Sequence, residues 1–276
     1  MTTTVSVFHA SDLHFGHPAV PEQYEAIEAL IQDRQYDVVA ISGDLSQRAR
    51  AGEFQRARVF IQRAEQVSKV IVVPGNHDVA WWRAPFGVGD EAKLLANYKE
   101  YISRDTEPVL RVPGATFVGV NTAHGVARWT LTWNLRQLSV IGTVRRYQLE
   151  RLRAEFARSP AGDARVVVMH HNPVKGELSQ RHGLMDTKRV LGAFADMEVD
   201  LVLCGHDHQE AIHYIEHTRK GTVISTAGTV SNRARGGRPS SVNSIRITSE
   251  NIEVSTLVWS SESGTFAPGP TKCFAR

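Results

Sequence analysis

Cysteine is scarce in this sequence: the 276 residues include two, Cys204 and Cys273. Two cysteines so far apart exclude a disulfide framework and a C-x-x-C metal site. Apolar runs are also short, and none approaches the roughly 18 uncharged residues that a membrane-spanning helix needs. The stretch from Met1 to Val5 lacks the basic start and the apolar segment of a signal peptide. We therefore expect a cytoplasmic protein without a membrane span.

An excess of charge of one sign is missing as well. The 32 basic and 29 acidic residues leave a formal charge of +3 when the 12 histidines are neutral. So small an excess does not support binding to a nucleic-acid backbone, but it does not repel an anionic small molecule. We therefore expect no nucleic-acid partner. The composition leaves the oligomeric state open, a homodimer included.

Apolar runs of strand length alternate with helical patterns, and 42% hydrophobic residues exclude a disordered protein. The alternation predicts an α/β fold with a largely parallel sheet. Strands are expected at residues 5–10, 37–42, 69–73, 109–112, 116–120, 165–169 and 201–204. Helices are expected at residues 21–34, 53–66, 91–103, 145–158 and 187–195. Short runs at 211–216, 222–226, 242–247 and 252–258 then predict an antiparallel meander.

The chain shows no internal repeat and no linker that would mark a domain boundary. Residues 1–259 are therefore expected to form one domain. Two tryptophans, Trp129 and Trp133, suggest that residues 128–143 form an ordered surface loop. The Ser, Gly and Pro residues after Trp259 predict a loose C-terminal tail over 260–276.

Polar side chains follow five of the expected strands, at the point where each strand ends. The residues are Asp12 and His14, Asp44, Asn76 and His77, His170 and His171, and finally His206 and His208. In open α/β sheets, ligands bind beyond the carboxyl ends of the strands. If the strands are neighbours, these side chains converge on one site.

The converging set contains carboxylates, an amide and imidazoles, but no thiolate. Such ligands suit Mn, Fe, Zn or Co, and a carboxylate shared by two ions would allow a dinuclear site. In an extended segment, the Asp12 and His14 side chains point the same way. Glycines before Asp44, Asn76 and His206 permit close backbone approach or a positive φ.

Each motif by itself has a less specific interpretation. A lone D-x-H is more often a polar pair at a strand end, and G-N-H-D alone is typical of a turn. A lone His-His at a strand end is usually a surface feature. What indicates a metal site is the occurrence of all five motifs, in order, at the ends of strands.

In the order D-x-H, G-D, G-N-H-D, H and G-H-x-H, the motifs resemble the calcineurin-like metallophosphoesterase superfamily. The resemblance implies a four-layer αββα sandwich, in which helices flank two mixed β-sheets. It also implies two divalent or trivalent metal ions between the sheets. Mn²⁺ and Fe²⁺ or Fe³⁺ are the expected ions, with Zn²⁺ or Co²⁺ as alternatives.

The resemblance further implies a role for each motif residue. The first metal site would use Asp12, His14, Asp44 and His208. The second would use Asp44, Asn76, His170 and His206, so that Asp44 bridges the ions. His170 is favoured over His171 because it directly follows the expected strand. His77 would act as the catalytic residue, either as general acid or by stabilising the transition state.

The stretches GDLSQRARAGEF, VPGNHDVA and RARGGRPSSVNSIRI most resemble bacterial class III cyclic-nucleotide phosphodiesterases. This implies a phosphodiesterase that hydrolyses small phosphodiesters, 3′,5′-cyclic AMP first among them, by attack of a metal-bound hydroxide on phosphorus. Two residues depart from the family pattern. Gln47 replaces an acid that would support the catalytic histidine, and Asn172 replaces a proline at the pocket rim. Substrate-binding candidates are His171, His124 and Arg235, the last in a loop with Arg233 and Arg238.

Other functions stay open at this point. The same metals could act on UDP-2,3-diacylglucosamine, a glycerophosphodiester or a 2′,3′-cyclic nucleotide. A lipid substrate would need an apolar groove, which Trp81, Trp82 and Phe86 could rim. A metal-binding scaffold protein is the non-enzyme alternative, but such relatives usually lose ligands that this sequence keeps.

Overall fold

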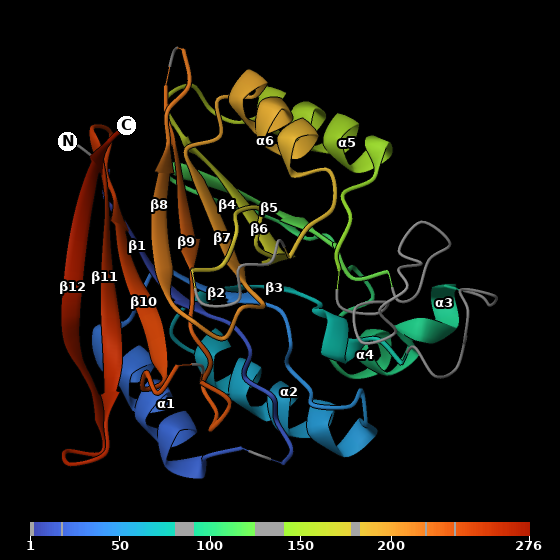
Figure 1. Ribbon diagram of the computed structural model, residues 1–276, viewed down its shortest axis with the longest axis vertical. Helices are drawn as coiled ribbons and strands as arrows, with labels where there is room; N and C mark the ends of the chain where they lie inside the picture. Colours follow the sequence, from blue (N-terminus) through green and yellow to red (C-terminus); the bar gives the residue numbers. More distant parts are fainter. Residues whose placement is uncertain are drawn as a thin grey trace.

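The computed structural model describes residues 3–17, 19–80, 91–124, 141–177, 183–218, 220–234 and 236–276. Its described strands form two six-stranded sheets that pack face to face, with helices on their outer faces (Figure 1). The four-layer αββα architecture with two mixed sheets is therefore confirmed. Among the described helices, none is long and apolar enough to cross a membrane.

The first sheet contains the three strands that open the chain. Its order is β12 (Thr265–Ala275), β11 (Asn251–Ser260), β10 (Ser241–Ile247), β1 (Val5–Ala10), β2 (Val38–Ser42) and β3 (Lys69–Val73). Strands β1, β2 and β3 run parallel, and helices α1 (Pro21–Arg34) and α2 (Ala51–Glu65) connect them. Their carboxyl ends therefore lie along one edge of this sheet.

The second sheet is built in the same way. Its order is β4 (Val109–Val112), β5 (Ala115–Val120), β6 (Ala164–His171), β7 (Leu201–Gly205), β9 (Thr222–Thr226) and β8 (Ala211–Ile215). Strands β5, β6, β7 and β9 are parallel. Helices α5 (Arg146–Ala157) and α6 (Thr187–Asp196) connect three of them and cover the outer face (Figure 1).

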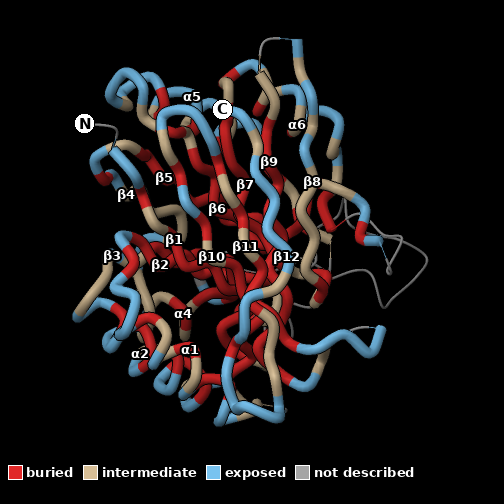
Figure 2. The backbone as a smooth tube through the Cα atoms, turned by 90° about the vertical axis from the view of Figure 1, so that its left-hand side faces the viewer, coloured by how far each residue is buried: buried red, intermediate tan, exposed pale blue. Residues whose placement is uncertain are grey.

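Three apolar layers hold the four structural layers together. Side chains such as Val7 and Val38 of the first sheet meet Phe117 and Val166 of the second in the central layer. The other two layers lie between each sheet and its helices. Figure 2 shows buried backbone running through the middle of both sheets. Because parallel strands are covered on both faces, they read in the sequence as continuous apolar runs.

The short strands after β7 do not form the predicted antiparallel meander. Strands β8 and β9 belong to the second sheet, and β9 runs parallel to β7. Strands β10, β11 and β12 are antiparallel neighbours in the first sheet. The antiparallel pairs β8–β9 and β10–β11 are as predicted, but their union in one meander was wrong, because the length of a run does not tell which sheet a strand joins. All five residues of β9 are buried, as expected of a strand covered on both faces.

The predicted loose tail over 260–276 is also wrong, because most of it forms β12. This strand pairs along the length of β11, and Phe266 packs on Trp259 with ring centroids 5.3 Å apart. The prolines that suggested a loop, Pro268 and Pro270, occupy the terminal strand of the sheet order. An edge strand tolerates proline because its outer N–H groups need no strand partner.

The predicted helix at 91–103 is divided into α3 (Glu91–Leu94) and α4 (Ala96–Tyr101). A short 3₁₀ turn, η1 (Asn76–Asp78), follows β3. Several sequence predictions lie outside the described residues. They concern Trp81, Trp82 and Phe86, most of the predicted loop at 128–143, and Arg235.

Candidate metal centre

The polar side chains after β1, β2, β3, β6 and β7 gather where the carboxyl ends of the two sheets meet. Main-chain hydrogen bonds hold the first two of these segments together. The N–H of Asp12 donates to the carbonyl of Gly43 at 3.0 Å, and that of His14 donates to Asp44 at 2.9 Å. The structure thus brings all five motifs to one place.

Four buried or nearly buried side chains form a first group: Asp12, His14, Asp44 and His208. One ligand atom from each lies within 4.8 Å of the others. Nε2 of His208 is 3.2 Å from Oδ1 of Asp12 and 3.2 Å from Nε2 of His14. Nε2 of His14 lies 4.0 Å from Oδ2 of Asp44. The spacing suits ligands that share one ion.

A second group lies on the other side of Asp44. Oδ1 of Asn76 is 3.0 Å from Nε2 of His170 and 2.9 Å from Nδ1 of His206. Nε2 of His170 is also 3.3 Å from Oδ2 of Asp44. Asp44 therefore contacts both groups, as a carboxylate that bridges two ions must.

The hydrogen bonds around the imidazoles test whether the residues fit a metal. Nδ1 of His170 donates to the carbonyl of Ser42 at 2.8 Å, and Nδ1 of His208 donates to that of Arg233 at 3.3 Å. In the neutral rings, Nε2 therefore presents a lone pair to the site. Within the described structure, Oδ1 of Asp12 is buried and accepts no hydrogen bond. Converging lone pairs without protons are the environment of a cation, so the set fits a metal.

Burial keeps two of these histidines neutral. It lowers the pKa of His14 and of His206 from 6.5 to about 3. His170 behaves differently: burial opposes its charge, but the Asp44 carboxylate, helped by Asp12 and the Ser42 carbonyl, raises the pKa of His170 to about 9. In return, the pKa of Asp44 lies well below its ordinary value despite burial. A metal bound here would take the place of the proton that His170 otherwise holds.

The backbone at the motif residues is left-handed rather than extended. Asp12 has a φ of 54° and His14 a φ of 49°. The expectation that an extended segment aligns these two side chains was therefore wrong, although both reach the site. Positive φ also occurs at Asp44, His206 and His208. Non-glycine residues adopt this conformation at a cost of roughly 1–2 kcal/mol each, and such strain is concentrated at functional sites.

Glycines allow the strand ends to approach one another. Gly43 has a φ of 93°, which favours glycine. A Cβ atom at Gly75 would overlap the carboxylate of Asp44, and one at Gly205 would overlap the hydroxyl of Ser11. The glycines that precede motif residues thus serve both purposes expected from the sequence.

His77 belongs to neither ligand group, as the resemblance implied. Its Nδ1 donates to the main-chain carbonyl of Gln47 at 2.8 Å, and its N–H donates to Oδ1 of Asp44 at 2.8 Å. The ring stands edge-on to that of His14, with centroids 4.8 Å apart. The carboxylate expected to be missing at position 47 is replaced by a main-chain acceptor.

Asp78 was given no role from the sequence, although it is the last residue of G-N-H-D. Its carboxylate accepts hydrogen bonds from the N–H groups of Leu45, Ser46 and Gly75 at 3.1, 2.8 and 2.9 Å. Burial, and then the charge of Asp44, raise the pKa of Asp78 to about 6. Asp78 therefore binds the segment after β2 to the segment after β3 and holds Asp44 beside Asn76.

The substrate-binding candidate His171 is buried, and one of its ring nitrogens lies within 4.8 Å of ligand atoms of His170 and His206, so the three histidines also form a possible set of metal ligands. Thr122 Oγ1 lies 2.7 Å from its Nδ1, and its ring packs on that of His206 with centroids 4.6 Å apart. Burial and the neighbouring histidines hold the pKa of His171 well below its ordinary value. A role in substrate binding stays a prediction, as does the preference for His170 over His171 as the metal ligand.

The other candidates are placed less directly. His124 follows β5 and lies close enough to His171 to contribute to the lowering of the pKa of that residue. Arg235 lies outside the described residues. Asn172 donates from Nδ2 to the carbonyl of Val174 at 2.7 Å, so this departure from the family pattern closes a local turn.

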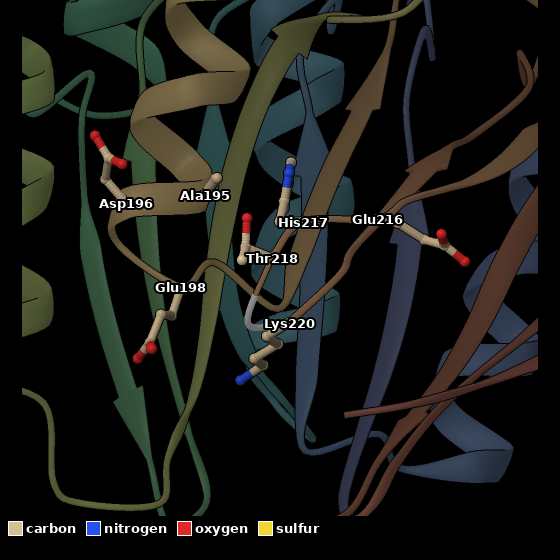
Figure 3. A pocket seen from close by; sticks show the side chains of 7 residues that line it. All are labelled: Ala195, Asp196, Glu198, Glu216, His217, Thr218 and Lys220. Carbon is tan, nitrogen blue, oxygen red and sulfur yellow. The ribbon is translucent and has the colours of Figure 1, made fainter.

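A cavity of about 780 Å³ lies away from the five motifs, near the end of α6 and the β8–β9 connection (Figure 3). The carboxylates of Glu198 and Glu216 point away from each other there. Lys220 at its rim pairs with Asp200. Among the described residues that line the cavity, no set of metal ligands converges.

The family model for calcineurin-like phosphoesterases matches residues 5–210. This stretch covers most of the chain, and the chain belongs to the calcineurin-like phosphoesterase family. The match includes every motif from Asp12 to His208. No curated protein matches the sequence.

Several solved structures share the fold. The purple acid phosphatase PPD1 from yellow lupin (Lupinus luteus) seeds is 12% identical with a TM-score of 0.72, over 100% of this chain and 54% of that chain. PhoD is 12% identical with a TM-score of 0.67, over 99% of this chain and 68% of that chain. GAP50, the anchor in the inner membrane complex of Plasmodium, is 13% identical with a TM-score of 0.58, over 99% of this chain and 89% of that chain. This chain spans about half the length of the lupin protein, and at these identities the likeness shows the fold alone.

Proposed function

We propose that this protein is a dinuclear-metal-dependent phosphodiesterase that hydrolyses small phosphodiesters. The observation that carries the proposal is the position of Asp44 between two groups of buried and partly buried side chains that carry metal-binding atoms, with His77 beside them. A metal-binding scaffold would not need a histidine that binds no metal and is nevertheless held against the centre. The enzyme is therefore favoured over the scaffold.

Seven of the motif residues are proposed to bind the two metal ions, and His77 is proposed to act on the ester. Asp12, His14 and His208 would hold one ion, and Asn76, His170 and His206 the other, with Asp44 shared. Two bound ions supply Lewis acidity, which acidifies water and neutralises charge on phosphoryl oxygens. The same donor set fits Mn²⁺, Fe²⁺ or Fe³⁺, with Zn²⁺ and Co²⁺ as alternatives.

His77 is the residue proposed to act on the leaving group. Its Nδ1–H is committed to the carbonyl of Gln47, so the remaining ring nitrogen, Nε2, is the atom that can transfer a proton. A protonated His77 would donate to the departing alkoxide, or stabilise its charge in the transition state. The hydrogen bonds at both ends of the residue fix the ring for this purpose.

For the substrate, we propose 3′,5′-cyclic AMP, on the resemblance of three sequence stretches to class III cyclic-nucleotide phosphodiesterases. UDP-2,3-diacylglucosamine, glycerophosphodiesters and 2′,3′-cyclic nucleotides are the competing substrates. The aromatic residues that would favour a lipid lie outside the described structure. A panel of these substrates separates the possibilities once activity is established.

The first experiment compares bis(p-nitrophenyl) phosphate with p-nitrophenyl phosphate, using metal-stripped protein to which Mn²⁺ is added back. We expect metal-dependent hydrolysis with the diester preferred. The Asn76→Ala variant, which lacks a ligand of the second group, should be inactive under the same conditions. A preference for the monoester would indicate a phosphatase instead. Absence of hydrolysis with Mn²⁺, Fe²⁺, Zn²⁺ and Co²⁺ would favour the scaffold.

A further inference from the structure

Arg233 lies in the connection between β9 and β10 and is attached to the first ligand group through its backbone. Its carbonyl accepts the hydrogen bond from Nδ1 of His208 at 3.3 Å, and its N–H donates to Oγ of Ser231 at 3.3 Å. The main chain of Arg233 is therefore fixed next to a candidate metal ligand.

The side chain of Arg233 turns to another part of the same site. Its Nη1 donates to Oε1 of Gln47 at 3.1 Å, and the residue is half-buried. Gln47 is also the residue whose carbonyl holds His77. The guanidinium is thus anchored on the residue that orients the proposed general acid, on the His77 side of the metal centre.

The partner of this guanidinium carries no charge. An amide oxygen accepts one N–H but leaves the positive charge of arginine in place, whereas a carboxylate would neutralise it. Among the described residues, no ion pair includes Arg233. Arg238 in the same loop differs: it pairs with Glu210 at 3.1 Å and with Glu177 at 3.7 Å. Of the two arginines of this loop that the structure describes, Arg238 is paired with carboxylates, and Arg233 keeps its uncompensated charge beside the site.

We propose that Arg233 binds an anionic oxygen of the substrate phosphate, and that Gln47 keeps the guanidinium available by holding it without neutralising it. The inference rests on the proposed function, since it assumes that a phosphate ester occupies the centre. A planar guanidinium is suited to this role because it can present two N–H groups to one phosphate. The neutral residue at position 47, a departure from the family pattern, thereby gains a function.

The test measures phosphate affinity in three variants of the full chain loaded with Mn²⁺. The variants are Arg233→Ala, Gln47→Glu and, as the matched control, Arg238→Ala, which removes the same charge from the same loop. Binding of inorganic phosphate is followed by calorimetry, and KM and kcat are measured with bis(p-nitrophenyl) phosphate. Metal content and thermal unfolding show whether each variant retains the site.

Arg233→Ala should raise the phosphate Kd and the KM by about tenfold to a hundredfold, as expected for a lost charge-assisted hydrogen bond. Its kcat should stay within about threefold of the wild type, because the contact exists before the chemical step. Gln47→Glu should also weaken phosphate binding, because the new carboxylate would form an ion pair with Arg233 and neutralise it while the arginine itself is retained. Arg238→Ala should bind phosphate as the wild type does.

The inference is overturned if Arg233→Ala and Gln47→Glu bind phosphate as tightly as the wild type. It is also overturned if Arg238→Ala loses as much affinity for phosphate as Arg233→Ala. The affinity would then depend on the total positive charge of the loop and not on a contact with Arg233. Its failure is distinct from that of the proposed function. Hydrolysis by the wild type with unchanged binding in the variants defeats the role of Arg233 alone. Phosphate binding that depends on Arg233 without any hydrolysis defeats the proposed enzyme and retains the anion contact.

Discussion

The main-chain carbonyl of Gln47 accepts a hydrogen bond from Nδ1 of His77 at 2.8 Å. A carbonyl in this position selects the ring tautomer and orientation, as a carboxylate would, but it adds no negative charge beside the imidazole. Because the acceptor belongs to the backbone, the side chain of Gln47 is available to Arg233. One residue therefore serves two neighbours by different atoms.

A first prediction separates His77 from the ligands that surround it. Replacement of His77 by alanine should lower kcat with bis(p-nitrophenyl) phosphate by about 10²–10⁴-fold, the usual contribution of general acid–base catalysis. Bound Mn²⁺, measured by elemental analysis, should be unchanged. Asn76→Ala is the matched variant from the adjacent position and should lose activity together with one of the two ions, because Asn76 belongs to the second group only. Loss of metal from His77→Ala would show that His77 is itself a ligand.

A second prediction concerns Asp44, the residue that contacts both ligand groups. In Asp44→Ala, both ions should bind weakly, because each loses a carboxylate that no other residue replaces. In His206→Ala, the first group is complete, and one ion per chain should remain. The measurement is metal content after dialysis against limiting Mn²⁺. Equal losses in the two variants would contradict the assignment of Asp44 as the bridge.

A third prediction concerns the stability provided by Asp78. Its buried carboxylate accepts N–H groups from two segments, so Asp78→Ala leaves those donors without a partner. The free energy of unfolding should fall by about 3 kcal/mol, the scale of losing a buried hydrogen-bonded carboxylate. The exposed Asp33 on α1 is the matched control, and its replacement by alanine should change stability by less than about 0.5 kcal/mol. Urea denaturation measures both, and equal effects would remove the structural role of Asp78.

A fourth prediction follows from His9, which is fully buried in β1 with Nε2 2.9 Å from Oγ of Ser42. Burial lowers its pKa from 6.5 to about 3. Between these values the unfolded chain holds a proton on His9 that the folded protein lacks, so stability must fall as the pH falls below 6.5. The slope from this residue approaches about 1.4 kcal/mol for each pH unit well below pH 6.5. His9→Gln, which retains a hydrogen-bonding group, should lose that slope in urea unfolding between pH 7 and pH 5. Identical pH dependence in the variant and the wild type would contradict the prediction.

The arrangement of sheets and helices was predictable where the pattern of apolar residues was long and local. Helix α1 coincides with the predicted range, because its apolar face and its starting proline lie within one segment. The left-handed backbone at Asp12 and His14 was not predictable, since it depends on bonds to carbonyls some 30 residues away. The hydrogen-bond acceptor of His77 was missed for a related reason. It is a main-chain carbonyl, which every residue has, so the sequence does not show which one is used. The ligand roles themselves stay predictions that the metal measurements test.

A fifth prediction concerns β12, where the sequence suggested a loose tail. Phe266 is buried and packs on Trp259. It belongs to the apolar layer between the first sheet and helices α1 and α2. Phe266→Ala should therefore lower the free energy of unfolding by about 3 kcal/mol, as large-to-small changes in a core do. Thr265→Ala, at an exposed neighbouring position, should change it by less than about 0.5 kcal/mol. If both variants unfold at the same urea concentration as the wild type, the strand does not contribute to the core. If only Phe266→Ala is destabilised, residues after Trp259 are an integral part of the first sheet.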